Sequence, residues 1–326
     1  MRSCCLSIIF VLCLLSPVLG VQGKANPFTI ALPPDHSVID GPLVSIVIVT
    51  DGSLETMRLR VNNIDYPILE KVDKTVCKAI KLAEGYNTVT LIGSKKDGTT
   101  EEQKIALFYR SALSGRYNNA PDSFRPYNFH IRDREGKCIF CHDLGQKKAN
   151  KVSQDTEQSP CFQCHKRLLE SKFVHGPASV WECTTCHNST IKGHKYRVPK
   201  PEQTICYSCH SDSAATWKAK KFVHGPFSMG MCSVCHNPHT SDNDFFLRKP
   251  TTDLCLSCHE EKASGAHVVA GITGNGHPVR NKPDPLHPGR ELSCASCHNP
   301  HAADFVDLLF RDRSAGFEFC TSCHKF

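Results

Sequence analysis

The chain has 326 residues, of which 20 are cysteine, and a formal net charge of +7, and a chain of this length typically forms about two domains. So many cysteines exclude an ordinary cytosolic protein, in which thiols stay reduced and disulfides are rare. The basic excess does not by itself indicate a nucleic-acid partner, because no other feature of the sequence supports one.

Residues 1–23 are typical of a secretory signal peptide. Arg2 supplies the positive end, residues 6–15 form an apolar run, and the small residues Gly20 and Gly23 suit cleavage. The run is shorter than the roughly 20 apolar residues that a membrane span requires. We therefore expect an exported mature protein, with a retained anchor or a lipid-modified cysteine as the alternative.

Residues 27–110 carry the pattern of short β-strands. Residues 44–50 form an apolar, β-branched run, and apolar side chains alternate with polar ones across 57–61, 89–91 and 105–109. Asp-Gly pairs between these runs supply turn chemistry. Short strands separated by such turns predict an all-β sandwich.

The segment LAEGYNTVTLIGSKKDGTT, residues 82–100, resembles the last hairpin of bacterial immunoglobulin-like domains. The resemblance implies that residues 27–110 form an immunoglobulin-like sandwich. Within this domain we expect Cys77 to be a small buried side chain of a strand. We expect His36 to be a surface residue rather than a ligand.

The pattern changes after residue 110. Residues 111–129 hold glycine and proline among polar residues and are interpreted as a linker. In residues 130–326 long periodic segments are absent, and short polar stretches separate cysteine motifs. We expect this second domain to have little regular secondary structure, with short helices and loops.

Eight copies of Cys-x-x-Cys-His lie in the second domain and use sixteen cysteines. The cysteine pairs are Cys138 and Cys141, Cys161 and Cys164, Cys183 and Cys186, Cys206 and Cys209, Cys232 and Cys235, Cys255 and Cys258, Cys294 and Cys297, and Cys320 and Cys323. The histidines that follow them are His142, His165, His187, His210, His236, His259, His298 and His324. Two thiols at this spacing each form a thioether with a haem vinyl group, and the next histidine donates a nitrogen to the iron. The motifs therefore predict eight covalently attached haem c groups.

Two other interpretations of the cysteine pairs fit less well. Zinc sites of four cysteines would combine the Cys-x-x-Cys units and would not need a histidine after each one. Disulfides within such pairs usually mark redox enzymes rather than structural links. Haem also accounts for the net charge, since each haem adds two carboxylates that the basic excess offsets.

Ten histidines remain for the second axial position of the irons, and one of them, His36, belongs to the β domain. Most of the others are regularly placed. His130, His175 and His224 lie eight residues before a motif, His287 lies seven before one, His239 and His301 lie in Cys-His-Asn-Pro-His, and His194 follows His187 by seven. We expect these seven histidines and His277 to be the second ligands.

These histidines define an internal repeat. Each unit has an upstream histidine, a first motif, usually a second free histidine, and a second motif. The first motifs of the four units begin at Cys138, Cys183, Cys232 and Cys294. Unit one has no second free histidine between its two motifs. We expect its missing ligand to come from elsewhere, with His277 preferred and His267 as the alternative.

Residues 232–259 read Cys-Ser-Val-Cys-His-Asn-Pro-His and then Cys-Leu-Ser-Cys-His, and they resemble the doubled Cys-x-x-Cys-His family of multihaem cytochromes c. Residues 276–301 are similar to the same pattern, and the resemblance covers residues 130–326. It implies electron transfer in the periplasm or outside the cell. His194 departs from the Asn-Pro-His pattern of the family.

The haem-binding part of the chain is too short to form an ordinary core. Residues 138–324 provide 187 residues for eight haems. The haems would then form the core themselves, and neighbouring rings must lie close enough for electrons to pass between them. Two histidines on each iron leave no open coordination position, so we expect an electron carrier rather than an enzyme.

The alternative is a multihaem reductase of the nitrite, hydroxylamine or tetrathionate type, which would keep one haem open. Other redox proteins or cytochromes are the expected partners. The β domain would either attach the cytochrome to an outer-membrane or cell-surface complex or to neighbouring copies, or serve as a spacer. The sequence leaves the periplasm and the cell surface open as locations.

Overall fold

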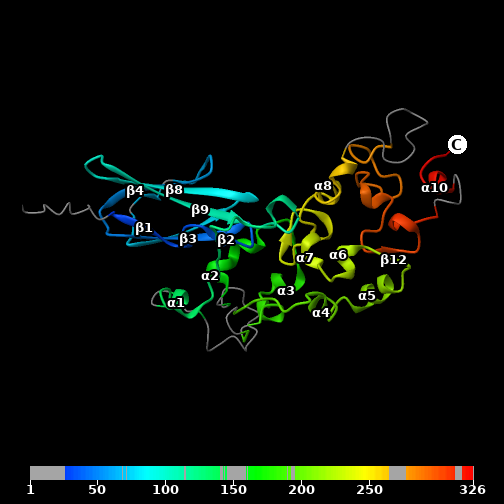
Figure 1. Cartoon of the computed structure of the whole chain (residues 1–326), viewed down its shortest axis with the longest axis horizontal. Coiled ribbons are helices and arrows are strands. Elements are labelled where there is room, and N and C mark those ends of the chain that lie inside the picture. The colour runs from blue at the N-terminus through cyan, green and yellow to red at the C-terminus, as the bar shows by residue number, and fades with distance from the viewer. Residues whose placement is uncertain are drawn as a thin grey trace, which may run out of the picture.

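The computed structural model describes residues 26–67, 69–70, 72–113, 115–139, 142, 144, 159, 161–188, 190–191, 195–263, 277–312 and 318–325. The expected signal peptide lies outside these residues, as do Cys141, His194 and His267. A β-rich part and a part made of short helices lie at opposite ends of an elongated molecule (Figure 1). Within the described ranges, no helix is long and apolar enough to cross a membrane.

The N-terminal region is a β sandwich, as predicted. Its strands are β1 (Phe28–Leu32), β2 (Ser37–Ile39), β3 (Leu43–Thr50), β4 (Leu54–Val61), β5 (Ile64–Asp65), β6 (Leu69–Glu70), β7 (Thr75–Lys81), β8 (Gly85–Lys95), β9 (Thr100–Tyr109) and β10 (Arg125–Pro126). One sheet has the order β1-β3-β7, and the other has the order β10-β2-β9-β8-β4-β5, with β6 also paired to β4. Alternating side chains meet between the sheets, and Ile46, Met57 and Leu91 have no exposed surface.

Cys77 does not occupy the buried position that we expected. It lies in β7 but is exposed, because the antiparallel register pairs it with Val47. The side chains of β3 that point into the sandwich are those of Ile46 and Ile48, which flank Val47. Since successive side chains of a strand point to opposite faces, Val47 and Cys77 lie on the outer face of the sheet.

Part of the expected linker belongs to the β domain. Strand β10 pairs in parallel with β2, with Arg125 opposite Ser37. Phe124 is buried beside Val38 and Phe108, and Tyr127 packs partly buried against the main core. These aromatic side chains supply the apolar area that holds the segment on the sheet, although the residues around them are polar.

The C-terminal region consists of short helices, two-stranded ribbons and loops, as predicted. Its α-helices are α1 (Arg132–Glu135), α2 (Phe162–His165), α3 (Gly176–Ser179), α4 (Gln203–Cys206), α5 (Ser211–Lys218), α6 (Gly225–Ser228), α7 (Cys232–Cys235), α8 (Thr251–Leu256) and α10 (Glu318–Thr321). The 3-10 helices among the described residues are η1 (Gly115–Tyr117), η3 (Lys166–Leu169), η4 (Cys183–Thr185), η5 (Asp244–Phe246), η6 (Glu260–Lys262), η7 (Cys294–Ser296) and η8 (Val306–Leu308). The ribbons join β11 (Phe173–Val174) to β13 (Thr240–Ser241) and β12 (Phe222–Val223) to β14 (Ala302–Ala303).

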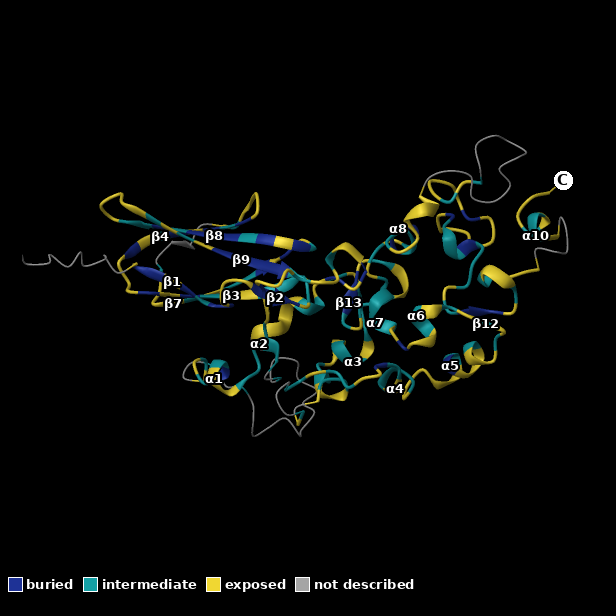
Figure 2. Cartoon of the chain, in the orientation of Figure 1, coloured by how far each residue is buried: buried dark blue, intermediate teal, exposed yellow. Residues whose placement is uncertain are grey.

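Apolar burial is concentrated in the sandwich. Among the described residues, every large side chain that is fully buried lies in the first 110 positions. Figure 2 shows the same contrast, with buried strands at one end and mostly intermediate or exposed segments at the other. Helices of one turn bury little surface by themselves. The C-terminal region therefore needs something other than its own apolar side chains to hold it together.

Candidate functional site

A large cavity runs through the described part of the C-terminal region. Its volume is about 3920 Å³, and each of the eight Cys-x-x-Cys-His motifs contributes at least one lining residue. A site for one small ligand usually measures about 300–1,000 Å³. The cavity is thus large enough for several prosthetic groups side by side.

All eight motifs, numbered 1 to 8 in chain order, adopt the same backbone turn. In each of them the backbone N–H of the histidine donates to the carbonyl of the first cysteine at 2.9–3.0 Å. This is the hydrogen bond of one helical turn, which brings positions i, i+3 and i+4 to one side. The turn therefore directs two thiols and one imidazole toward the same ligand.

Six of the motif histidines lie opposite a second histidine. The pairs are His165 with His130 at motif 2, His187 with His239 at motif 3, His210 with His175 at motif 4, His236 with His301 at motif 5, His259 with His224 at motif 6, and His324 with His277 at motif 8. Their ring centres are 5.8–6.3 Å apart. The ring planes are nearly parallel in the first five pairs, at 8–27°, and nearly perpendicular, at 87°, in the last.

This spacing fits a metal ion between the rings. A metal bonded at about 2 Å to one nitrogen of each ring holds the two nitrogens about 4 Å apart and the ring centres about 6 Å apart. The Nε2 atoms of His187 and His239 lie 3.5 Å apart. Within the described part of the chain, no three His, Cys, Asp or Glu side chains converge on one point. The donors therefore form opposed pairs, as two axial haem ligands do.

The Nδ1 atoms of several motif histidines are held by the backbone. Nδ1–H of His187 donates to the carbonyl of Tyr196 at 2.7 Å, and Nδ1–H of His236 donates to the carbonyl of Phe245 at 2.8 Å. His298 donates in the same way to Asp307, at 2.6 Å. Such a bond fixes the tautomer and leaves Nε2 with a free lone pair for a metal.

Burial keeps two of the opposing histidines, His239 and His301, neutral. It lowers the pKa of His239 to about 4, and the nearby His187 adds to the shift. Burial likewise lowers the pKa of His301 to about 4, with a contribution from His236. A neutral imidazole is the form that binds a metal. These side chains are therefore in the ligating state at neutral pH.

The opposing histidines follow a rule across the repeat. In units one, two and three, the histidine of the second motif lies opposite the upstream histidine of the same unit, as His210 lies opposite His175. The first-motif histidines of units two and three lie opposite the second free histidine of the following unit, as His187 lies opposite His239. Units three and four thus each complete one site of the unit before them.

The β ribbons explain this offset. At β11 and β13 the backbone N–H of His175 donates to the carbonyl of His239 at 3.0 Å, and at β12 and β14 that of His224 donates to His301 at 2.9 Å. Each ribbon joins the upstream histidine of one unit to the second free histidine of the next. The ligands of two neighbouring motifs are thereby held on one small sheet.

The rule corrects the place of the missing ligand. Unit one needs no second free histidine for itself, because the rule assigns the second ligand of motif 1 to unit two. That histidine is His194, which lies outside the described residues and stays a prediction. The expectation that His277 completes unit one is wrong, because His277 lies opposite His324 at motif 8. The repeat supplies no following unit for His298 of motif 7.

His287 occupies the upstream position of unit four, but the structure places it differently from its counterparts. Its Nδ1 lies 3.0 Å from Asp284, and its side chain is 46% exposed. Among the described histidines, His277 rather than His287 faces His324. The spacing from this histidine to the first cysteine of its unit is one residue shorter in unit four than in the other units.

Cysteine contacts order the motifs along the chain. Cysteine side chains of consecutive motifs lie close together at Cys161 and Cys183, at Cys206 and Cys232, and at Cys255 and Cys294. The remaining neighbours approach closely enough to interact electrostatically, at Cys138 with Cys164, Cys186 with Cys206, Cys235 with Cys258, and Cys297 with Cys323. Motifs 1 to 8 therefore follow one another in space as they do in sequence.

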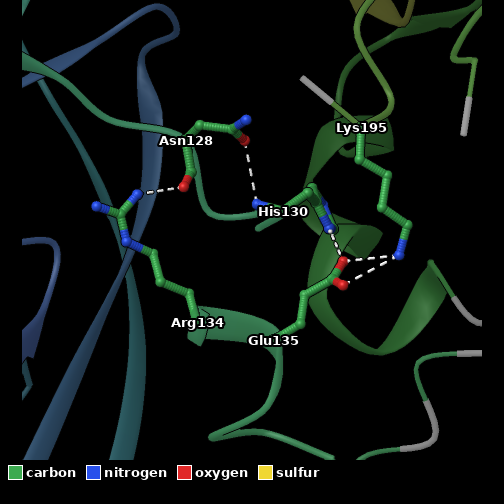
Figure 3. Close-up of polar contacts among 5 residues, drawn as sticks. All are labelled: Asn128, His130, Arg134, Glu135 and Lys195. Atoms are coloured by element: carbon green, nitrogen blue, oxygen red, sulfur yellow. Dashed lines mark hydrogen bonds and ion pairs between the residues drawn. The ribbon is translucent and has the colours of Figure 1, made fainter. Parts of the chain in front are cut away.

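Three buried carboxylates lie beside the motifs. Glu135 accepts from Nδ1 of His130 at 3.0 Å and from Lys195 at 2.9 Å (Figure 3). The other two bind serines that lie inside motifs. Glu202 accepts from the hydroxyl of Ser233 at 2.7 Å, and Asp284 accepts from the hydroxyl of Ser296 at 2.5 Å.

Tyr207 supplies a further test of fit. Its hydroxyl is buried and, among the described residues, has no hydrogen-bond partner, and the residue lines the large cavity. A buried hydroxyl without a partner costs free energy. A carboxylate such as a haem propionate would accept from it. The residues present therefore fit the haem that the motifs predict.

Sequence reasoning missed the contribution of the β domain. Val47 and Ala79, on the outer face of the β3–β7 sheet, line the same cavity as the motifs. Lys249 lies 3.9 Å from Glu84 of the β domain. The signal was present in residues 44–50, which are almost continuously apolar, since a strand covered on both faces shows such a run.

Comparisons with known proteins agree with the repeat. The family described as the doubled CXXCH motif matches the chain at residues 175–215, 224–264 and 287–326. Each match begins at the upstream histidine of a unit and spans two motifs. No curated protein matches the chain at a significant level.

Three solved structures each resemble about a quarter of the chain. The fibronectin(III)-like modules of Clostridium thermocellum CbhA share 15% identity at a TM-score of 0.22, over 25% of this chain and 94% of theirs. CopC from Methylosinus trichosporium OB3b shares 15% identity at a TM-score of 0.20, over 24% of this chain and 85% of its own. A Jonesia denitrificans lytic polysaccharide monooxygenase shares 9% identity at a TM-score of 0.21, over 24% of this chain and 59% of its own. These likenesses carry no argument about function.

Proposed function

We propose that the chain, whose residues 175–215, 224–264 and 287–326 match the doubled CXXCH family, is a multihaem c-type cytochrome that binds eight covalently attached haems and conducts electrons along them. The observation that carries the proposal is the set of six opposed histidine pairs with ring centres 5.8–6.3 Å apart. Both axial positions of a haem iron are filled at such a pair.

The number eight rests on the common turn of the motifs. Motifs 1 and 2 lie outside the residues that the family matches. They nevertheless have the same N–H to carbonyl bond, from His142 to Cys138 and from His165 to Cys161, at 2.9 Å. His165 also has its opposing histidine, His130, with ring centres 6.0 Å apart. All eight motifs thus have the local geometry that haem attachment needs.

Conduction is supported by the order of the motifs and by the closed histidine pairs. Bound haem c supplies one-electron redox chemistry at its iron. The chain would attach each group at two cysteines, it supplies opposed imidazoles for six of the groups, and consecutive attachment points lie close together, as at Cys161 and Cys183. The protein therefore acts as a scaffold that fixes the spacing of redox groups.

The alternative remains a reductase with one open haem. Motifs 1 and 7 are the places to test it, since the repeat assigns the second ligand of motif 1 to a histidine outside the described residues and supplies no next unit for motif 7. We propose the carrier because histidine supply and the repeat favour closed sites. Carbon monoxide distinguishes the two functions, because it binds reduced haem iron that has an open position.

We further propose that the protein is exported and works in the periplasm or at the cell surface, with other redox proteins or cytochromes as partners and without nucleic acid. An outer-membrane or cell-surface complex and self-assembly are both compatible with this setting. Residues 1–23 support export, because they have the charge and apolar run of a signal peptide. Cell fractionation followed by haem staining tests the location, and an N-terminal sequence of the mature protein tests cleavage.

The central experiment is expression in a host that matures c-type cytochromes. Intact mass and haem quantification should give eight haems per chain, and the reduced protein should bind no carbon monoxide. A colourless product, or one that contains zinc in place of iron, would contradict haem attachment. One equivalent of bound carbon monoxide would instead support the reductase.

A further inference from the structure

At motif 2, a carboxylate lies within hydrogen-bonding distance of the Nδ1 atom of the opposing histidine, whereas backbone carbonyls hold this atom at several other motifs. His224 donates from Nδ1 to the carbonyl of Pro300 at 2.9 Å, and His277 lies 3.0 Å from that of Pro278. The opposing histidine of motif 2, His130, instead faces a carboxylate, that of Glu135, at 3.0 Å. His259 of motif 6 is 3.9 Å from Glu261, which is beyond hydrogen-bonding distance.

We propose, on the basis of the eight-haem function above, that Glu135 sets the reduction potential of the haem at motif 2 by accepting a hydrogen bond from Nδ1 of His130. Glu135 is a positioning residue, since it acts on the iron through His130. It gives the haem at motif 2 a lower reduction potential than the haems at the other described histidine pairs.

The bond lies where a carboxylate has a strong effect. The side chain of Glu135 is 8% exposed and that of His130 is 27% exposed, so water competes little for either group. A hydrogen bond to an ionised acceptor is stronger than one to a neutral carbonyl. It increases the basicity of the imidazole. A more basic axial ligand stabilises the oxidised iron over the reduced iron and so lowers the potential.

The surroundings fix His130 in the orientation that this role requires. Its backbone N–H donates to the side chain of Asn128 at 3.1 Å, and Arg134 donates to the carbonyl of Asn128. The His130 ring packs edge-on against Tyr196, with centres 4.8 Å apart. Figure 3 shows Nδ1 directed at the Glu135 carboxylate. The ring lies opposite that of His165 of motif 2, with ring centres 6.0 Å apart.

Lys195 weakens the effect of the Glu135 carboxylate on His130. Its ammonium group donates to both oxygens of Glu135, at 2.9 and 3.0 Å. It therefore competes with His130 for the negative charge, and its removal should strengthen the effect of Glu135 on His130. Substitution of Glu135 and substitution of Lys195 should therefore shift the reduction potential at motif 2 in opposite directions.

The chain offers a matched control in Glu202 and Lys200. Glu202 is as buried as Glu135, with 9% of its side chain exposed, and it pairs with Lys200 at 3.1 Å. It accepts from Ser233 and contacts no histidine in the described structure. Substitution of Glu202 removes the same charge from a comparable site but leaves every axial imidazole with its partner.

The experiment compares Glu135→Gln with Glu202→Gln in the haem-loaded full chain. Redox titrations followed by absorbance and by electron paramagnetic resonance give the midpoints, and the signal lost in His130→Ala identifies motif 2. Glu135→Gln should raise the midpoint of motif 2 and alter its low-spin signal, whereas Glu202→Gln should leave that signal unchanged. If Glu135→Gln moves this midpoint no more than Glu202→Gln does, the proposal is wrong.

Lys195→Met, with Lys200→Met as its control, keeps the test decisive if Glu135→Gln does not mature. It should lower the midpoint of motif 2, and an unchanged midpoint would overturn the proposal. Mass spectrometry of the peptide that contains Cys161 and Cys164 shows whether motif 2 carries its haem. Failure of the eight-haem function is thereby distinguished from failure of the role of Glu135.

Discussion

His187 and His239 are 52 positions apart in the chain, yet their Nε2 atoms lie 3.5 Å apart and their ring planes differ by only 8°. His187 belongs to unit two of the repeat and His239 to unit three. Neither unit can therefore complete this site alone. Stacked repeats depend on contacts with their neighbours for stability. Here neighbouring repeats share a pair of ligands as well as a contact surface.

Replacing His239 with alanine should open one iron without detaching the haem. His187 and the thioethers of Cys183 and Cys186 would still hold it, but the side opposite His187 would be empty. The reduced variant is expected to bind one equivalent of carbon monoxide where the parent binds none. His36→Ala, in the β domain, is the control. A variant that still binds no carbon monoxide would show that another side chain ligates motif 3.

His194→Ala tests the repeat rule at motif 1. If unit two completes unit one as unit three completes unit two, the variant should gain one open iron, detected again by carbon monoxide. Haem on the peptide that contains Cys138 and Cys141 should be retained. A closed site in the variant would mean that motif 1 takes its second ligand from outside the repeat.

His277 and His287 give opposite expectations at motif 8. His277 faces His324 with ring centres 6.1 Å apart, whereas among the described residues His287 contacts Asp284 and no motif histidine. His277→Ala should therefore open one iron, and His287→Ala should open none. Carbon monoxide binding to the two variants, measured side by side, decides between them. The reverse result would show that His287, at the upstream position of unit four, is the second ligand of motif 8.

Ring orientation predicts a spectroscopic difference between motif 8 and the other described pairs. Nearly parallel imidazoles, at 8–27°, donate into the same iron orbital and split the pair of orbitals that holds the unpaired electron. Perpendicular imidazoles, at 87° in motif 8, raise both orbitals equally. The oxidised protein should show one low-spin signal of much larger anisotropy, and His277→Ala should remove it. A spectrum without that signal would contradict the perpendicular arrangement.

Glu202 predicts how stability depends on pH. Burial alone would raise its pKa, but hydrogen bonds from Ser233 and Lys200 outweigh burial and lower the pKa below the ordinary 4.5. The stabilisation from Glu202 is thus fully present above about pH 4.5 and is lost as the pH falls through the lower folded-state value. Glu202→Gln should cost on the order of 1–2 kcal/mol at neutral pH and should reduce the loss of stability on acidification.

Denaturant unfolding of both proteins between neutral and acid pH measures this difference. Glu55→Gln, at an exposed position of β4, serves as the control and should leave both the stability and its pH dependence unchanged. An equal loss of stability on acidification in Glu202→Gln and in the parent would exclude the role assigned to Glu202.

The sequence alone determined the attachment chemistry. Two thiols and an imidazole at positions i, i+3 and i+4 meet on one helical turn, so the eight motifs and their sixteen cysteines could be identified without a fold. The alternation across residues 57–61 and 105–109 likewise predicted strands of a sandwich. These features depend on neighbours within a few residues, and local spacing is enough to specify them.

Only the tertiary structure decided which free histidine faces which motif. His187 meets His239 and His236 meets His301 because ribbons between consecutive units bring distant segments together, and the sequence prediction misplaced His277 for this reason. The exposure of Cys77 follows from the strand register. The hydrogen bonds of Glu135 with His130 and Lys195 follow from the path of the chain. Each is a contact whose geometry is set by residues far away in the sequence.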